Sequence, residues 1–120
     1  MQCSSCQIPL KDIQFRGISI HECSECLGRW FDRGELTKAK DNADEDLRWL
    51  DFDPFDVKSN KFFVVSNEGL ACPKCAQQMV VSTYANSGVS IDKCEQCEGV
   101  WLKDGEFKKI IDYLEKNNII

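Results

Sequence analysis

The residues in this chain that could do chemistry are above all its eight cysteines, which fall into four C-x-x-C pairs. Two such turns, brought together, place four thiolates around one metal ion in a tetrahedron. The spacing therefore predicts two structural Zn²⁺ ions per chain, because four protein ligands leave no open position on the metal. The predicted ligands are Cys3, Cys6, Cys23 and Cys26 for one site and Cys72, Cys75, Cys94 and Cys97 for the other.

Disulfide bonds and reactive thiols are the alternatives to metal binding. A secreted disulfide framework needs an export signal, and the chain begins Met-Gln-Cys-Ser-Ser-Cys without a basic start or an apolar run. We therefore expect a reducing, cytoplasmic location. Apolar runs such as Phe62 to Val65 are too short to cross a bilayer, so no membrane association is expected.

The chain contains an internal repeat, in which residues 23–36 match residues 94–107. The two copies share, besides both cysteines, the pairs Gly28/Gly99, Trp30/Trp101, Gly34/Gly105 and Glu35/Glu106. The cysteine pairs are 16 residues apart in the first copy and 18 in the second. A hairpin whose tip differs by two residues absorbs this difference without moving the ligands.

Each half is predicted to position its cysteines by a β-hairpin between the two pairs. The expected strands are 10–15 and 18–22 around a turn at Arg16-Gly17, and 79–84 and 89–93 around a turn near Asn86-Ser87-Gly88. A helix should follow each second pair. In the second copy, helical spacing of apolar residues predicts a core-facing stripe of Phe107, Ile110, Ile111 and Leu114.

The pattern C-x-x-C, hairpin, C-x-x-C-x-G-x-W with a following G-E resembles the bacterial zinc-ribbon family related to the transcription-factor-IIB type. The resemblance covers both copies. Two departures from the family's pattern are visible: Ser4 stands where the family has proline, which Pro73 retains, and Lys103-Asp104 stands where the family has aspartate followed by a variable residue. Neither departure touches a cysteine.

Residues near the cysteines have structural interpretations. Gly28 and Gly99 are expected to adopt positive φ so that amides point at sulfur. Trp30 and Trp101 are expected to pack each hairpin against the following helix, with base stacking as the alternative.

Three polar residues near the first site also have structural rather than catalytic interpretations. Asp32 and Glu35 are expected to form a capping box at the start of the first helix, and Asp104 or a neighbour should cap the second. His21, which has Asp92 at its position in the second copy, is expected to face solvent on a strand and not to bind metal.

The segment between the two copies is acidic. Residues 41–70 hold eight acidic side chains and three basic ones, while the whole chain has a formal charge of −5. Within it, residues 44–56 alternate acids with Trp49, Phe52 and Phe55, which suits either an ordered linker or a partner-binding motif. Residues 61–66 are expected to form a strand at the edge of one ribbon.

The sequence thus predicts a small, zinc-dominated α+β protein with two tandem zinc ribbons, each a β-hairpin plus a C-terminal helix. The expected units are ribbon 1 at 1–40, an acidic, partly ordered linker at 41–70, and ribbon 2 with an amphipathic helix at 71–120. With both zinc ions bound the charge falls to about −9, because four thiolates outweigh one Zn²⁺. So acidic a protein lacks the positive field that draws proteins to phosphate backbones.

Three functions are compatible with this layout. The first is a non-enzymatic interaction module that binds a protein partner; the family resemblance implies a setting such as transcription or another nucleic-acid machine. The second is direct nucleic-acid binding through Arg16, Arg29 and Arg33, or through Lys103, Lys108 and Lys109. The third is a redox-sensing zinc switch. No nucleophile accompanies the carboxylates, so no enzymatic activity is expected.

Overall fold

The computed structural model describes residues 1–43, 55, 62–84 and 87–117. Two helices and seven strands form in the order β1 (Lys11–Phe15), β2 (Ile18–Glu22), β3 (Arg29–Phe31), α1 (Glu35–Ala43), β4 (Phe62–Ser66), β5 (Val80–Tyr84), β6 (Ser90–Lys93), β7 (Val100–Leu102) and α2 (Glu106–Asn117). Trp49 and Phe52 of the acidic-aromatic segment lie outside the described residues.

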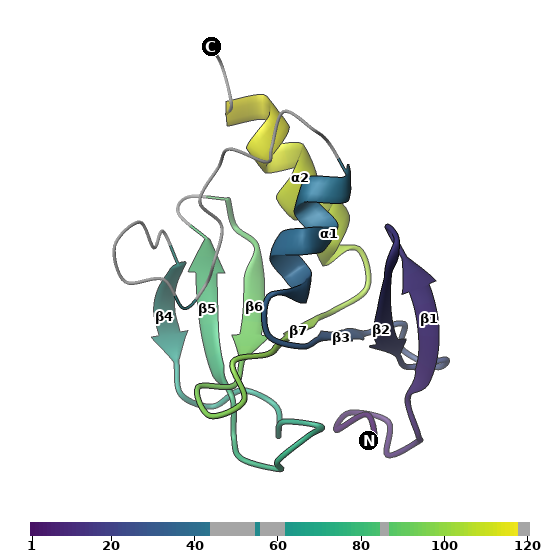
Figure 1. Ribbon diagram of the computed structural model, residues 1–120. Coiled ribbons are helices and arrows are strands. Elements are labelled where there is room, and N and C mark those ends of the chain that lie inside the picture. Colours follow the sequence, from purple (N-terminus) through teal and green to yellow (C-terminus); the bar gives the residue numbers. More distant parts are fainter. Residues whose placement is uncertain (44–54, 56–61, 85–86, 118–120) are drawn as a thin grey trace.

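All seven strands belong to one antiparallel sheet, with the order β1-β2-β3-β7-β6-β5-β4 (Figure 1). The two halves meet at β3 and β7, where Trp30 lies opposite Trp101. The two predicted hairpins therefore lie at the two ends of a single sheet, which the sequence did not predict, and the linker expected at 41–70 lies partly outside the described residues. The physical reason for the single sheet is that a unit of about 40 residues cannot bury enough apolar surface by itself.

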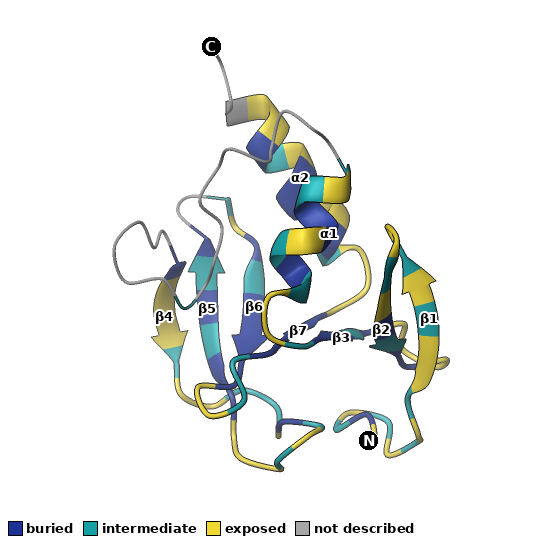
Figure 2. Cartoon of the chain, viewed as in Figure 1, coloured by how far each residue is buried: buried dark blue, intermediate teal, exposed yellow. Residues whose placement is uncertain are grey.

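The central strands separate two apolar clusters, because successive side chains on a strand point to opposite faces. On one face, Phe31, Val100 and Leu102 join α1 and α2 in the larger core. On the other face, Trp30 and Trp101 join the cysteines. In Figure 2 the buried sides of both helices face this sheet, while the outer strands β1 and β4 are largely exposed or half-buried.

The predicted hairpins are present. Arg16 and Gly17 both have positive φ, 50° and 80°, which is the two-residue turn whose twist suits a hairpin. The predicted helix stripe is also present: Phe107, Ile110, Ile111 and Leu114 are all buried in the larger core. No helix in the described part of the chain is long and apolar enough to cross a membrane.

Candidate metal centres

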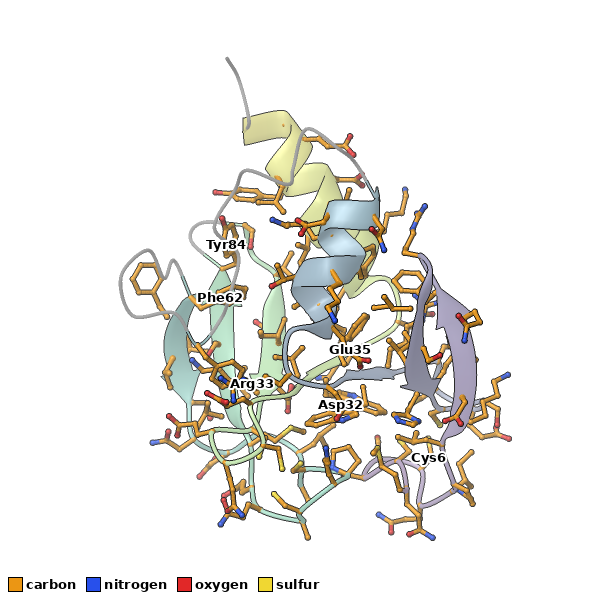
Figure 3. The ribbon with its side chains drawn as sticks, viewed as in Figure 1. Cys6, Asp32, Arg33, Glu35, Phe62 and Tyr84 are labelled. Atoms are coloured by element: carbon orange, nitrogen blue, oxygen red, sulfur yellow. The ribbon has the colours of Figure 1, made fainter. Side chains whose placement is uncertain are left out.

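The structure brings the eight cysteines together in the two groups that the spacing predicts. The first site consists of Cys3, Cys6, Cys23 and Cys26, and the second site of Cys72, Cys75, Cys94 and Cys97; within each site the sulfurs lie within 4.8 Å of one another. Both sites lie on the face of the sheet opposite the helices. In Figure 3, Cys6 lies at the bottom of the view and the helices at the top.

The spacing of the sulfur atoms fits a tetrahedral metal ion. The Sγ atoms are 3.7 Å apart between Cys3 and Cys26, 4.0 Å between Cys72 and Cys97, and 3.6 Å between Cys75 and Cys94. A zinc ion with four Zn–S bonds of about 2.3 Å requires sulfur separations of about 3.8 Å. A disulfide requires about 2.05 Å. The two groups therefore fit two zinc sites and not disulfide bonds.

All four C-x-x-C pairs form the same tight turn. The residue after the second cysteine donates its amide to the carbonyl of the first cysteine at 2.8 to 2.9 Å and has φ between 59° and 67°. A backbone amide inside each pair also donates to the sulfur of the first cysteine, at 3.3 to 3.5 Å. Amides aimed at sulfur stabilise thiolates, as a site with four of them requires. The residues with positive φ are Gln7, Leu27, Ala76 and Glu98.

The expectation for Gly28 and Gly99 was wrong, because neither has positive φ. Their role is close packing across the two halves. A Cβ on Gly28 would lie 2.2 Å from Cζ2 of Trp101, and one on Gly99 would lie 2.3 Å from Cζ2 of Trp30. Each tryptophan ring therefore lies over the glycine of the opposite half. The internal repeat identified these four residues but gave no signal of which half each contacts.

The two tryptophans pack, as expected, but not against the following helices. Trp30 is fully buried and Trp101 is 3% exposed, both within the cluster that contains the cysteines. Base stacking would require an accessible ring face. The buried rings instead join the two metal sites into one apolar layer.

The thiol pKa values within each site are split. Burial, reinforced by the neighbouring thiols, raises the pKa of Cys6 and of Cys97 to about 12. Burial also acts on Cys23, but backbone amides and neighbouring thiols outweigh it and lower its pKa to about 7. An amide donor likewise lowers the pKa of Cys75 to about 7. One sulfur per site thus ionises easily while others hold their protons, so a cation that binds all four must displace protons.

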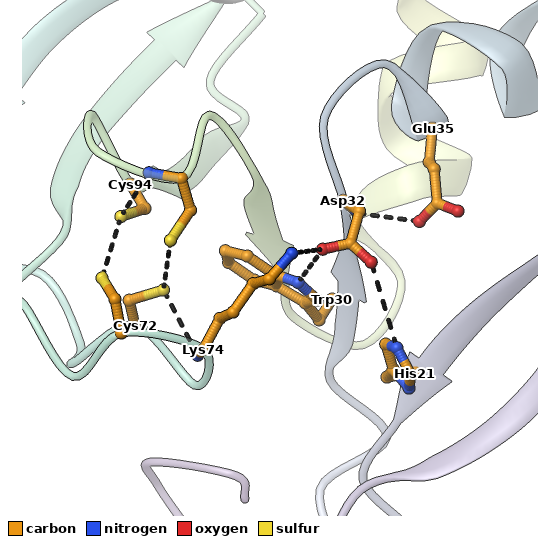
Figure 4. A network of polar contacts seen from close by, with 9 residues as sticks. His21, Trp30, Asp32, Glu35, Cys72, Lys74 and Cys94 are labelled. Carbon is orange, nitrogen blue, oxygen red and sulfur yellow. Dashed lines mark hydrogen bonds and ion pairs between the residues drawn. The ribbon is translucent and has the colours of Figure 1, made fainter. Parts of the chain in front are cut away.

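Asp32 connects the first half to the second site. Its Oδ1 accepts the indole N–H of Trp30 at 3.0 Å and lies 3.3 Å from Nζ of Lys74, which belongs to the second-site turn (Figure 4). The lysine's pKa is raised, chiefly because Asp32 accepts its hydrogen bond. The predicted capping box is half present: Glu35 accepts the amide of Asp32 at 2.8 Å, but the aspartate carboxylate binds indole and ammonium instead.

In the second copy, Glu106 makes the equivalent contact, accepting the amide of Lys103 at 2.7 Å. Lys103 therefore occupies the position of Asp32, and its side chain cannot accept the hydrogen bonds that Asp32 accepts. His21 is half-buried, with Nδ1 2.7 Å from Asp12 and Nε2 4.0 Å from Asp32. It belongs to neither group of metal-binding residues.

Two further contacts between the halves were not predicted from the sequence. Arg33 forms an ion pair with Glu98 at 2.9 Å, and the hydroxyl of Ser4 donates to the carbonyl of Ala71. Lys74, Arg33 and Glu98 all occupy positions at which the two copies differ. Such differences in a repeat are the only sequence signal that could have drawn attention to them.

A model of the transcription factor zinc-finger family, of the TFIIB zinc-ribbon type, matches residues 2–42 and again residues 71–113. The two matches together span more than half of the chain, and each contains one complete four-cysteine site. No curated protein and no solved structure matches the chain. The chain therefore belongs to the TFIIB-type zinc-ribbon family, with two copies of the ribbon joined in one sheet.

Proposed function

We propose that this protein is a non-enzymatic interaction module, in which two zinc ions hold a rigid sheet that binds a protein partner within transcription or another nucleic-acid machine. The observation that carries the proposal is the exposed edge of the sheet at β4. Phe63, Val64 and Val65 are 60%, 52% and 60% exposed there. They are the only run of consecutive large apolar residues exposed in the described part of the chain.

β4 is the last strand of the sheet, paired on one side with β5. Edge strands usually carry a charge or a proline that prevents another strand from pairing with them. Residues 62–66 contain neither, although a bulge between Val64 and Ser66 restricts the regular edge to its first half. An extended peptide that adds to such an edge gains main-chain hydrogen bonds, and its alternate side chains contact the exposed apolar residues.

The charge of the protein favours one kind of occupant. The formal charge is −5 and falls to about −9 when two zinc ions are bound by eight thiolates. Eight of the acidic residues lie between positions 41 and 70, on either side of β4 in the sequence. Electrostatic complementarity therefore favours an extended apolar segment flanked by Lys or Arg.

Direct nucleic-acid binding is the second candidate, supported by four cations around one hollow. Arg16, Arg29, Lys103 and Lys108 line a space of about 420 Å³ between the β1–β2 turn and α2. The same hollow is lined by Asp104, Asp112 and Glu115, and Arg29 is ion-paired with Glu22 at 3.0 Å. This mixture of charges is a weak match for a phosphate backbone, so we rank the protein partner first.

The test is capture of the partner from cell extract treated with nuclease, followed by binding of a synthetic peptide. The peptide is the partner's own apolar segment with its basic flanks. Phe63→Thr with Val65→Thr places β-branched residues, which favour strands, at both positions but removes the large apolar groups. This double variant should weaken peptide binding roughly tenfold, because two interface anchors are lost.

The matched control is Gln14→Thr on β1, at the opposite edge of the sheet, which should bind the peptide as the unmodified protein does. Capture that disappears after nuclease treatment would favour the nucleic-acid candidate. Self-association that depends on Phe63 would instead make a second copy the occupant of the edge.

A further inference from the structure

The internal repeat allows the surroundings of the two metal sites to be compared position by position. After β3, Asp32 and Arg33 reach the two turns of the second site and form ion pairs with Lys74 at 3.3 Å and Glu98 at 2.9 Å. Lys74 reaches from the second-site turn to Oδ1 of Asp32, which also accepts the indole N–H of Trp30 (Figure 4). The two turns of the second site are thus each joined to the first half by an ion pair.

At the first site, the equivalent residues cannot form these ion pairs. Lys103 and Asp104 stand in the places of Asp32 and Arg33, while Ser5 and Leu27 stand in the places of Lys74 and Glu98. Because serine and leucine carry no charge, Lys103 and Asp104 cannot form ion pairs with them. Beside these residues lies a cavity of about 270 Å³ lined by Ser5, Cys26, Gly28, Leu70, Trp101, Lys103 and Asp104.

This cavity reaches a metal ligand. Cys26, on its wall, is the only exposed cysteine of the eight; its equivalent, Cys97, is half-buried. Lys103 and Asp104 both line this cavity, so its wall carries one cation and one anion. Associative exchange at a closed four-thiolate zinc site requires an incoming ligand to reach the metal beside a sulfur that can leave.

From this difference we infer that the first site is an exchange site, which passes its zinc to an incoming thiolate through the cavity beside Cys26, whereas the second site retains its zinc. In the first step the incoming sulfur forms a bond to zinc and the bond from Cys26 breaks. The incoming thiol gives its proton to the solvent, and Cys26 takes one up. Zinc remains Zn²⁺ and no electrons are transferred, so no oxidant is required.

The experiment follows zinc leaving the holoprotein into the chromophoric chelator 4-(2-pyridylazo)resorcinol, after the zinc content has been counted. Glutathione serves as the thiol in one arm, and a short peptide with a C-x-x-C pair in the other, which distinguishes small thiols from protein thiols. One zinc should leave at a rate that rises with thiol concentration, and the other at least roughly 10-fold more slowly. Alkylation and peptide mapping after the fast phase should find the cysteines of the first site modified.

Two variants test the ion pair between Lys74 and Asp32, one by rebuilding it at the first site and the other by removing it at the second. Ser5→Lys with Lys103→Asp places at the first site the equivalent of the Lys74–Asp32 ion pair. This double variant should slow the fast phase by roughly 10-fold. Lys74→Ser removes the ion pair with Asp32 beside the second site and should accelerate the slow phase. A single release rate for both ions, mapping of the fast phase to Cys72–Cys97, or rates independent of thiol would each overturn the proposal. Mapping the modified cysteines of the unmodified protein tests which site releases zinc first, even if a variant fails to fold.

Discussion

Cys94→Ser is expected to abolish the cooperative unfolding transition of the whole sheet, including its first half. Cys94 is 1% exposed, and a serine hydroxyl is a poor replacement for a thiolate in a zinc site. Structural zinc contributes on the order of 10 to 16 kcal/mol in small peptides, whereas an entire domain is stable by about 5 to 15 kcal/mol. Loss of one site therefore removes as much free energy as the domain has.

The effect should spread because the halves share their central contacts. Without the second site, Trp101 and β7 lose their support, and β3 loses the strand with which it pairs. Amide exchange in β1 and β2, far from the substitution in the sheet order, should become fast. Near-ultraviolet circular dichroism, thermal melting and amide exchange measure the outcome.

The matched control is Glu95→Ser, an exposed position in the same turn, which should melt as the unmodified protein does. Protected amides in β1 and β2 of Cys94→Ser would show that the first ribbon folds by itself, contrary to the shared-sheet account. An unchanged melting curve would show that the metal does not stabilise the second half.

Gly28→Ala is expected to destabilise the protein by about 1 to 3 kcal/mol, the usual cost of overpacking. The three atoms nearest to the added Cβ would all belong to the ring of Trp101, at 2.2, 2.7 and 3.1 Å. Chemical denaturation of the zinc-loaded protein measures the loss. Because the clash is with one side chain, Trp101→Leu should remove most of the extra cost of Gly28→Ala, so the two substitutions should be strongly non-additive.

Two other glycines provide the controls. A Cβ on Gly34 meets nothing within 4 Å, but φ there is +80°, so Gly34→Ala should cost about 1 to 2 kcal/mol and be additive with Trp101→Leu. A Cβ on Gly99 would also lie 2.9 Å from the carbonyl oxygen of Phe31. Trp30→Leu should therefore rescue Gly99→Ala less well. Additivity between Gly28 and Trp101 would contradict the packing of each tryptophan over the opposite half.

The grouping of the cysteines was predictable because C-x-x-C spacing is a local property and the repeat supplied it twice. The hairpins were predictable for the same reason: their turns and alternating strands are short-range patterns. The strands β3 and β7 were missed because three residues are too few to show a period, and because their partners lie in the opposite half. Because β3 and β7 are the strands that join the two halves, missing them meant that the single sheet was not predicted.

The contacts between the halves were beyond sequence reasoning for a related reason. Asp32 was assigned to a helix cap, which is a local role, while its carboxylate contacts Lys74, 42 residues away. The ring centroid of Phe55 lies 5.3 Å from Nζ of Lys93, and the ring is partly buried against the larger core. The other aromatics of that segment, Trp49 and Phe52, lie outside the described residues, so their partner-binding interpretation remains a prediction.

The most direct test of the account is zinc K-edge X-ray absorption, together with metal analysis, on protein purified without added metal. The account predicts two zinc ions per chain, each with four sulfur ligands at about 2.3 Å and no nitrogen or oxygen ligand. One ion per chain, an iron–sulfur cluster, or a mixed sulfur and nitrogen coordination shell would contradict it.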